Sequence, residues 1–268
     1  MKVAVAQISC ALGDVAENIR KLTRFCARAK EAGADLVVFP EMSDTGYAMP
    51  VIREYAAPWT EGAVPALRDV AKELSIAIIS GVSERDGASI YNSQVFIDAA
   101  GEIIGHYRKT HLFKPPPVEE HTCFACGDHL AGVDFSDLRL GLSICYDLRF
   151  PEVYRRLATE ENANVFILSS AWPFPRVEHF RILATARAIE NQSYIVVANR
   201  VGTDAGVTFC GNSVIIDPYG VVLASASADA EEMIFAELSA ESVELVRKRM
   251  PVFADRRQEL YRGYDFST

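Results

Sequence analysis

The chain has 268 residues, of which half are hydrophobic and 24% are charged, a composition typical of a folded globular protein rather than a disordered or fibrous one. Its net charge of −9 argues against nucleic acid and anionic membranes as partners. Six scattered cysteines fit reduced thiols and a cytoplasmic location better than a disulfide scaffold. No membrane span is expected, because the longest uncharged stretch, 162–175, is short and contains two prolines.

The N-terminal residues predict a strand followed by a helix. Gln7 interrupts the first apolar run, so this segment is not expected to be a leader peptide. Asp14 and Glu17 have the spacing of a capping box, which predicts the start of a helix. Gly33 is placed to end that helix.

Apolar runs and helical stripes alternate through most of the remaining chain. The predicted strands are 35–40, 76–82, 91–98, 102–108, 140–144, 212–217 and 221–226. The predicted helices are 64–75, 151–160, 176–192 and 240–249. Short turns at 99–101 and 217–220 predict two hairpins, whereas other strands have the continuous apolar character of buried parallel strands. We therefore expect one α/β domain with two mixed sheets between helical layers.

Three reactive side chains stand directly after predicted strands. Glu41, Lys109 and Cys145 each follow an extended run, and the last is followed by a predicted helix. In an open α/β sheet such strand ends converge on one crevice. A carboxylate, an ammonium group and a thiol meeting there would form a candidate acyl-transfer site.

Each of these residues also has an ordinary structural interpretation. Cys145 could be an inert buried thiol, but the start of a helix would favour its thiolate and would direct the N–H of Tyr146 at a developing oxyanion. Glu41 could be a solvated carboxylate, but its apolar neighbours predict burial, a raised pKa and a role as general base. Lys109 could be a surface lysine, but aromatic and apolar neighbours suggest that it polarises a carbonyl group.

Six motifs in the same order resemble the nitrilase superfamily of carbon–nitrogen hydrolases, and their residues are most similar to its amidase-like branch. The motifs are Phe39–Glu41, Tyr107–Phe113, Cys145–Glu152, Ala186–Gln192, Asn199–Gly202 and Gly211–Gly220. The similarity extends from the first strand to about residue 264. It implies a four-layer αββα sandwich of two mixed sheets flanked by helices, with no cofactor and no metal.

By the same resemblance, the catalytic residues are Glu41, Lys109, Cys145 and a second glutamate. The family pattern Glu-x-x-x-Phe-x-x-Gly places that glutamate at Glu120, with Phe124 and Gly127 in register. The adjacent Glu119 leaves a shift of one residue open.

A cluster of possible metal ligands lies in the same segment. His121, Cys123, Cys126 and His129 could ligate zinc by residue type. Structural zinc sites normally join two ligand pairs across a longer loop, and four ligands this close leave little backbone to enclose an ion. We therefore expect no metal site here.

The resemblance implies a hydrolase that cleaves the non-peptide C–N bond of a small linear amide through a cysteine thioester, releasing ammonia and a carboxylic acid. Small linear amides are the favoured class, such as terminal (ω) amides of dicarboxylic 2-oxo acids or other short aliphatic amides. N-carbamoyl amino acids or polyamines are the alternative, and a nitrilase, a non-catalytic binding subunit or a thiol-based redox protein are less favoured. Tyr47, Tyr146 and Trp172 are the candidate substrate-binding residues, although core packing explains Tyr47 and Trp172 equally well.

The partners expected are a small amide substrate and a second copy of the chain, without nucleic acid or membrane. The resemblance implies a homodimer or higher homo-oligomer. In it, residues 248–268 would form a C-terminal tail that reaches across to the partner subunit. The residues of this tail are basic and amphipathic, so it could equally fold back on its own domain.

Overall fold

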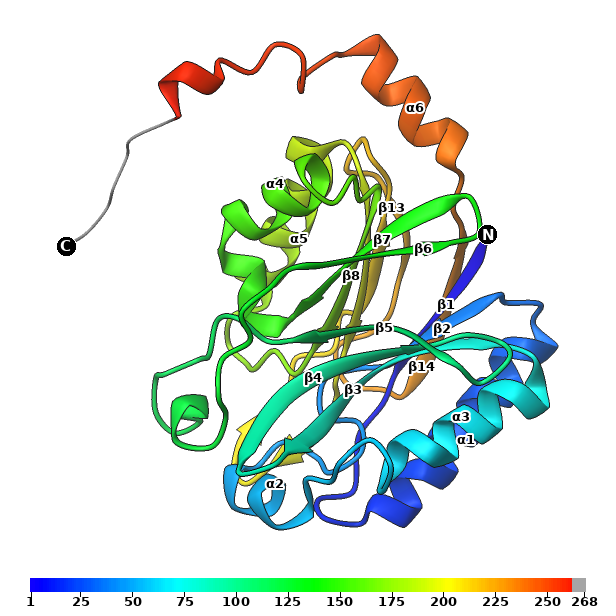
Figure 1. The fold of residues 1–268 in the computed structure, drawn as a ribbon, viewed down its shortest axis with the longest axis vertical. Helices are drawn as coiled ribbons and strands as arrows, with labels where there is room; N and C mark the ends of the chain where they lie inside the picture. Colours follow the sequence, from blue (N-terminus) through cyan, green and yellow to red (C-terminus); the bar gives the residue numbers. More distant parts are fainter. Residues whose placement is uncertain (262–268) are drawn as a thin grey trace.

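Two six-stranded mixed sheets lie face to face, and helices cover the outer face of each sheet (Figure 1). The computed structural model describes residues 1–261. Helices α1 and α3 cover the first sheet, and α4 and α5 cover the second. The predicted four-layer αββα sandwich is therefore confirmed.

Each sheet combines a parallel centre with antiparallel edges. The first sheet has the order β14-β1-β2-β3-β4-β5, with strands β1 (Lys2–Gln7), β2 (Leu36–Val38), β3 (Ala77–Asp86), β4 (Ser89–Ile97), β5 (Ile103–Arg108) and β14 (Glu232–Glu237). The second has the order β13-β12-β9-β8-β7-β6, with strands β6 (Ala131–Phe135), β7 (Leu138–Ile144), β8 (Val165–Ser170), β9 (Tyr194–Asn199), β12 (Val214–Ile216) and β13 (Val222–Ser225). Strands β10 (Thr203–Asp204) and β11 (Val207–Thr208) form a separate small ribbon.

The helices include three short 3₁₀ turns. The α-helices are α1 (Val15–Glu31), α2 (Met49–Tyr55), α3 (Ala63–Leu74), α4 (Pro151–Thr159), α5 (Val177–Asn191) and α6 (Ala240–Arg249). The 3₁₀ helices are η1 (Glu120–Thr122), η2 (Cys145–Arg149) and η3 (Gln258–Leu260). None of the helices described is long and apolar enough to cross a membrane.

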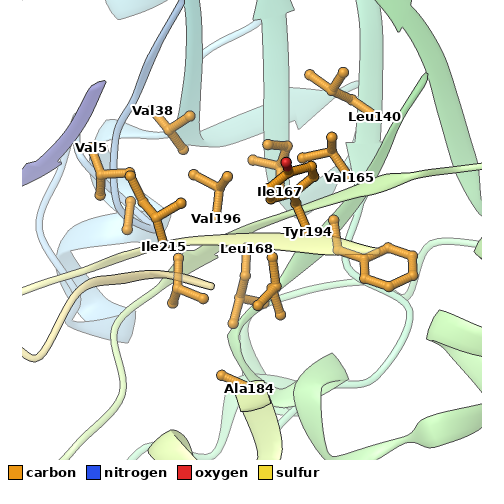
Figure 2. Packing of buried hydrophobic residues seen from close by; sticks show 14 of the residues in the cluster. Val5, Val38, Leu140, Val165, Ile167, Leu168, Ala184, Tyr194, Val196 and Ile215 are labelled. Atoms are coloured by element: carbon orange, nitrogen blue, oxygen red, sulfur yellow. The ribbon is translucent and has the colours of Figure 1, made fainter. Parts of the chain in front are cut away.

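The main core lies between the two sheets and continues beneath α4 and α5. In β1, Val3 and Val5 belong to this core, whereas the alternate residues Ala4 and Ala6 pack in the layer beneath α1 and α3. Successive side chains of a strand point to opposite faces of the sheet. An inner strand is buried on both faces, so the side chains on both faces are apolar. Figure 2 shows side chains of both sheets, from Val5 to Ile215, packed in the inter-sheet core.

The structure adds elements that the sequence did not predict. Strand β14 pairs antiparallel with β1 along its whole length and closes one edge of the first sheet. Its apolar run, 233–236, is only four residues long between Glu232 and Glu237, and of these four only Ile234 is buried. Helix α2 has only seven residues and begins in the loop that follows Glu41. Both elements are fixed by tertiary contacts rather than by a strong local pattern.

Only one of the two hydrogen bonds of the capping box predicted at the start of helix α1 is present. The side chain of Asp14 accepts a hydrogen bond of 2.9 Å from the Glu17 N–H, as an N-cap should. The Glu17 carboxylate does not return to the cap but pairs with Arg20 at 2.9 Å.

The C-terminal segment begins by folding back on its own chain. The carbonyl of Met250 accepts a 2.8 Å hydrogen bond from Gln192, and the ring of Phe253 lies beneath the guanidinium groups of Arg155 and Arg247. The chain then continues past α4 (Figure 1), where Arg256 and Tyr261 line a groove together with Glu152 and Arg155. The last part of the predicted tail, 262–268, lies outside the described residues, and contact with a second subunit stays a prediction.

Candidate active site

The three reactive residues predicted from strand ends lie at one end of the sandwich, but they come from both sheets. Glu41 and Lys109 follow β2 and β5 of the first sheet, and Cys145 follows β7 of the second. The prediction that the three residues meet in the crevice of a single open sheet is therefore wrong, because the strand ends of two facing sheets form the site. A direct link joins them, since the Ala171 N–H beyond β8 donates a 2.7 Å hydrogen bond to Glu41 Oε2.

Lys109 forms two buried ion pairs. Its Nζ donates to Glu41 Oε1 at 2.8 Å and to Glu120 Oε1 at 2.7 Å, and all three side chains are inaccessible to solvent. Burial raises the pKa of Glu41, the Lys109 ammonium lowers it and the Glu120 carboxylate raises it again, so the net pKa lies above the ordinary value. Burial lowers the pKa of Lys109, but the two carboxylates outweigh that effect and hold it well above its usual range. Lys109 is therefore a permanent cation between two acids.

Two glycines permit the close backbone approach that this cluster requires. A Cβ on Gly81 of β3 would lie 2.5 Å from the Glu41 Cα, and one on Gly127 would lie 2.1 Å from the Arg108 carbonyl oxygen. Such distances are far below van der Waals contact. The Gly127 N–H instead donates a 2.8 Å hydrogen bond to the carbonyl of Lys109. The glycine of the Glu-x-x-x-Phe-x-x-Gly pattern thus fixes the backbone of the lysine.

The geometry distinguishes between the two adjacent glutamates. Glu120 is fully buried, and beyond the lysine ammonium its carboxylate accepts hydrogen bonds of 2.6 Å from the Tyr47 hydroxyl and from the Phe113 N–H. Glu119 is exposed to solvent. Glu120, and not Glu119, therefore lies in the cluster.

Cys145 occupies a sharp elbow between β7 and the 3₁₀ helix η2. Its φ of 42° is left-handed, which is a strained conformation for a non-glycine residue. The buried Asp147 carboxylate supports the elbow by accepting 2.9 Å hydrogen bonds from the Ile144 N–H and the Tyr107 hydroxyl. Helix α4 begins only at Pro151, so a short 3₁₀ turn rather than a long helix follows the thiol.

The predicted stabilisation of a Cys145 thiolate by a helix N-terminus is wrong. Burial and then the nearby Glu41 carboxylate raise the pKa of Cys145 well above its ordinary value, and Lys109 offsets this only in part. The side chain is 6% exposed. The resting residue is a neutral thiol, so it requires a base before it can act as a nucleophile.

A small pocket opens on Cys145. All three predicted substrate-binding residues line it. The lining residues are Tyr47, Phe113, Val118, Cys145, Tyr146, Arg149, Ala171, Trp172, Pro173, Arg176 and Val207. Trp172 is held by its main-chain N–H, which donates to Asn199 Oδ1 at 2.8 Å, and by its indole N–H, which donates to the Arg176 carbonyl at 3.0 Å.

Two arginines in this pocket were not predicted from the sequence. The guanidinium group of Arg149 lies 4.7 Å from the centre of the Trp172 ring, and that of Arg176 lies 5.6 Å from the centre of the Phe113 ring. Among residues 1–261 neither arginine forms an ion pair with a carboxylate. Burial, with Arg176 as a further contribution, lowers the pKa of Arg149, although the nearby Tyr146 opposes this. The pocket therefore presents positive charge beside the thiol.

The residues considered as zinc ligands lie on the loop around η1. Cys123 Sγ contacts the Met49 carbonyl oxygen at 3.7 Å, and His129 Nδ1 lies 2.9 Å from Asp128. Within the part of the chain that the structure describes, no three His, Cys, Asp or Glu side chains form a group that could hold a metal ion.

Two further residues of the site were missed by the sequence reasoning. Asn92 of β4 donates hydrogen bonds to both glutamates of the cluster. The sequence feature that could have indicated Asn92 is the polar run 92–94 inside a predicted strand. Buried amide and hydroxyl groups there need hydrogen-bond partners. Asp147 lay within a recognised motif, but its hydrogen bonds to other segments could not be read from spacing.

Comparison with known proteins agrees with this geometry. The sequence profile of the carbon–nitrogen hydrolase family matches residues 2–248. A 2-oxoglutaramate amidase of Bacillus subtilis is 35% identical over 260 residues, which cover 97% of this chain and 98% of that protein. The crystal structure of Saccharomyces cerevisiae Nit3, a member of branch 10 of the nitrilase superfamily, superposes with a TM-score of 0.87 at 29% identity and covers 96% of each chain.

An amidase from Nesterenkonia sp. AN1 is similar as well. A mutant of it superposes with a TM-score of 0.87 at 27% identity, covering 98% of this chain and 96% of that one. That structure shows covalent addition of the acetamide moiety of fluoroacetamide at the active site cysteine. The present chain belongs to the carbon–nitrogen hydrolase family within the nitrilase superfamily, and it is an enzyme that hydrolyses carbon–nitrogen bonds other than peptide bonds.

Proposed function

We propose that this enzyme hydrolyses the terminal amide of a small linear substrate through a thioester on Cys145. The observation that supports this most directly is the buried Glu41–Lys109–Glu120 cluster, whose charges act on the Cys145 thiol. Its hydrogen-bond partners Tyr47 and Ala171 line the pocket that contains the thiol. A neutral thiol with a raised pKa needs a base, and a carboxylate whose pKa is also raised is suited to that role.

In the first half-reaction, Glu41 takes the thiol proton while Cys145 Sγ forms a bond to the amide carbon. The carbonyl electron pair moves onto oxygen, where Lys109 and the Tyr146 N–H stabilise the oxyanion. Lys109 Nζ has three hydrogens and gives two to the glutamates, so one remains for this purpose. The Tyr146 N–H lies in the first turn of η2 and is not used within that helix.

The same groups complete the cycle. Protonated Glu41 gives its proton to the leaving nitrogen as the C–N bond breaks, which releases ammonia and leaves a thioester. Glu41 then takes a proton from water as the water attacks the thioester carbon. When the S–C bond breaks, the acid departs and the proton returns to sulfur. Glu120 holds Lys109 in position throughout.

The two arginines favour a substrate that carries a carboxylate at the end remote from the amide. A guanidinium group binds carboxylate in a bidentate manner, and neither Arg149 nor Arg176 has an acidic partner among the described residues. An ω-amide of a dicarboxylic 2-oxo acid carries such a carboxylate. The compound in the name of the Bacillus subtilis relative, 2-oxoglutaramate, is one of these amides. N-carbamoyl amino acids also carry a carboxylate and remain the second candidate, whereas N-carbamoyl polyamines are cationic and would be repelled.

Ammonia release from four compounds tests this proposal. We expect 2-oxoglutaramate to be hydrolysed with a kcat/KM about 10-fold or more above that of pentanamide, which has the same chain length but neither the carboxylate nor the 2-oxo group. N-carbamoyl-β-alanine and N-carbamoylputrescine complete the set. Equal rates for the charged and uncharged amides, or preference for the cationic compound, would contradict the proposed substrate class.

A covalent intermediate is the second test. Acid quenching during turnover, followed by mass spectrometry, should find the acyl group on the peptide that contains Cys145. A disulfide on that peptide, with no acyl adduct and no ammonia released, would instead indicate a thiol-based redox protein.

We also propose, from the family resemblance, that the C-terminal segment 248–268 contacts a second copy of the chain. The exposed apolar side chains of Met250, Leu260 and Tyr261 are consistent with such a contact. Light scattering of the full chain and of a form ending at residue 253 should give a dimer and a smaller species, respectively. An unchanged mass would contradict this proposal.

A further inference from the structure

Asn92 lies at the centre of the charged cluster without being one of the predicted catalytic residues. It belongs to β4, which lies between β3 and β5 in the first sheet. Gly81 of β3 approaches Glu41, and β5 leads into Lys109. The main chain of Asn92 is itself part of this arrangement, because its carbonyl accepts a 2.8 Å hydrogen bond from the Lys109 N–H.

The side chain of Asn92 connects the two glutamates. Its Nδ2 donates to Glu41 Oε1 at 2.7 Å and to Glu120 Oε1 at 3.1 Å, so each hydrogen of the amide serves one carboxylate. The residue is completely buried. These bonds also fix the orientation of the amide, because an oxygen in the place of Nδ2 would face two acceptors.

A second buried asparagine, Asn18, forms a different set of hydrogen bonds. Asn18 on α1 uses its whole amide group, donating to the carbonyls of Ala11 and Asp44 and accepting from the Ala11 N–H. Asn92 Oδ1 has no hydrogen-bond partner among the described residues. The buried amide oxygens of Gln94, Asn191 and Gln192 also lack a partner there, so what distinguishes Asn92 is that its amide donates only to carboxylates.

We propose that Asn92 is a positioning residue for amide hydrolysis: it holds the Glu41 carboxylate against Lys109 and apart from Glu120, so that Glu41 stays ionised and able to accept the proton of Cys145. The inference rests on the role proposed above for Glu41. It adds a fourth side chain to the cluster, one that does not touch the substrate.

The physical reason is the shortage of positive charge in the cluster. Two carboxylates share the single ammonium of Lys109 in a site from which water is excluded, and like charges this close favour protonation of one of them. The other ionisable groups near Glu41 are Cys145 and Tyr47, and a negative charge on either would make this worse. The amide of Asn92 is a neutral donor that stabilises both negative charges without competing for a proton.

Substitution of Asn92 should change the pH dependence and not only the rate. We expect Asn92→Ala to lower kcat by about 10- to 100-fold with little change in KM, because the side chain does not contact the substrate. The acidic limb of the kcat/KM profile should move to higher pH, because Glu41 loses a donor to its charged form. Asn92→Asp keeps the size of the side chain but adds a third carboxyl group, so its acidic limb should move further in the same direction.

Asn18→Ala is the matched control. It removes a buried asparagine that also donates two hydrogen bonds, but away from the cluster, so it should lower thermal stability while leaving the acidic limb where it is in the wild type. Circular dichroism establishes that each variant is folded.

Two results would overturn the inference. One is an acidic limb at the wild-type pH in both Asn92 variants, and the other is loss of folding in both, which would show a structural role. Cys145→Ala in the same series separates this inference from the proposed function. If that variant is inactive while the Asn92 variants keep the wild-type profile, only the role of Asn92 fails; if it remains active, the thioester mechanism itself fails.

Discussion

The two sheets contribute to the site in different ways. The strand ends of the first sheet supply Glu41 and Lys109, whose polar atoms are fixed by ion pairs and hydrogen bonds in a fully buried cluster. The second sheet supplies Cys145 on a strained elbow, next to a pocket of aromatic side chains and two guanidinium groups. The charges of the first region are already paired, whereas Arg149 and Arg176 in the second have no carboxylate partner among residues 1–261.

This difference indicates how the work of the enzyme is divided. A group that moves protons must keep one position and a defined pKa, and dense hydrogen bonding provides both. A group that binds substrate must have unused bonding capacity, because the substrate fills it. Substitutions in the first region should therefore affect the chemical step and stability, and those in the second should affect the nucleophile and the choice of substrate.

The largest effect is expected from removing the nucleophile. Cys145→Ala should fold normally, because it takes away only one sulfur atom, and it should have no measurable turnover. Ammonia release and circular dichroism provide the two measurements. Hydrolysis near the wild-type rate would show that the thiol is not the nucleophile.

Removing the central cation should damage both stability and activity. Lys109→Met leaves two buried carboxylates without their partner, and we expect the free energy of unfolding to fall by about 3–5 kcal/mol. Urea denaturation measures this loss. The double variant Lys109→Met, Glu120→Gln should recover part of the stability, because one of the stranded charges is gone, but it should not recover activity. A single variant as stable as the wild type would contradict the ion-pair geometry.

The pH dependence of Cys145 alkylation links the two regions. Glu41 accepts a proton only when ionised, and burial raises its pKa, so reaction with iodoacetamide should slow as pH falls through a value above that of an ordinary glutamate. In Glu41→Gln the base is absent, and alkylation should become fast only at strongly alkaline pH, because burial also raises the pKa of Cys145. Identical profiles for the two proteins would show that Glu41 does not act on the thiol.

The smallest effect is expected at the pocket and should depend on the substrate. Arg149→Gln should lower kcat/KM for 2-oxoglutaramate by about 10- to 100-fold, because a charge-assisted hydrogen bond to its carboxylate is lost. Hydrolysis of pentanamide should change little. Arg20→Gln, which replaces an exposed arginine on α1, is the control and should affect neither substrate. Equal losses for both amides would show that Arg149 supports the pocket wall rather than binding the substrate charge.

The sequence predicted the architecture well where local patterns were strong. The parallel strands β2 and β7 were visible because strands buried on both faces are nearly continuously apolar. Helices α3, α4 and α5 lie within one or two residues of their predicted bounds. Strand β14 was missed because its stability comes from pairing with β1, more than 200 residues away in the chain.

The sequence by itself also determined which side chains stand at the candidate site, because Glu41, Lys109 and Cys145 lie at strand ends inside recognisable motifs. Only the tertiary structure decided which sheet carries each of them, that Glu120 rather than Glu119 joins Lys109, and that Asn92 bridges the acids. It also decided the charge state of the thiol, where burial outweighs the short helix that follows. The physical reason is common to all of these: local patterns record what a residue can do, but charge, desolvation and hydrogen bonding depend on neighbours that folding brings together from distant segments.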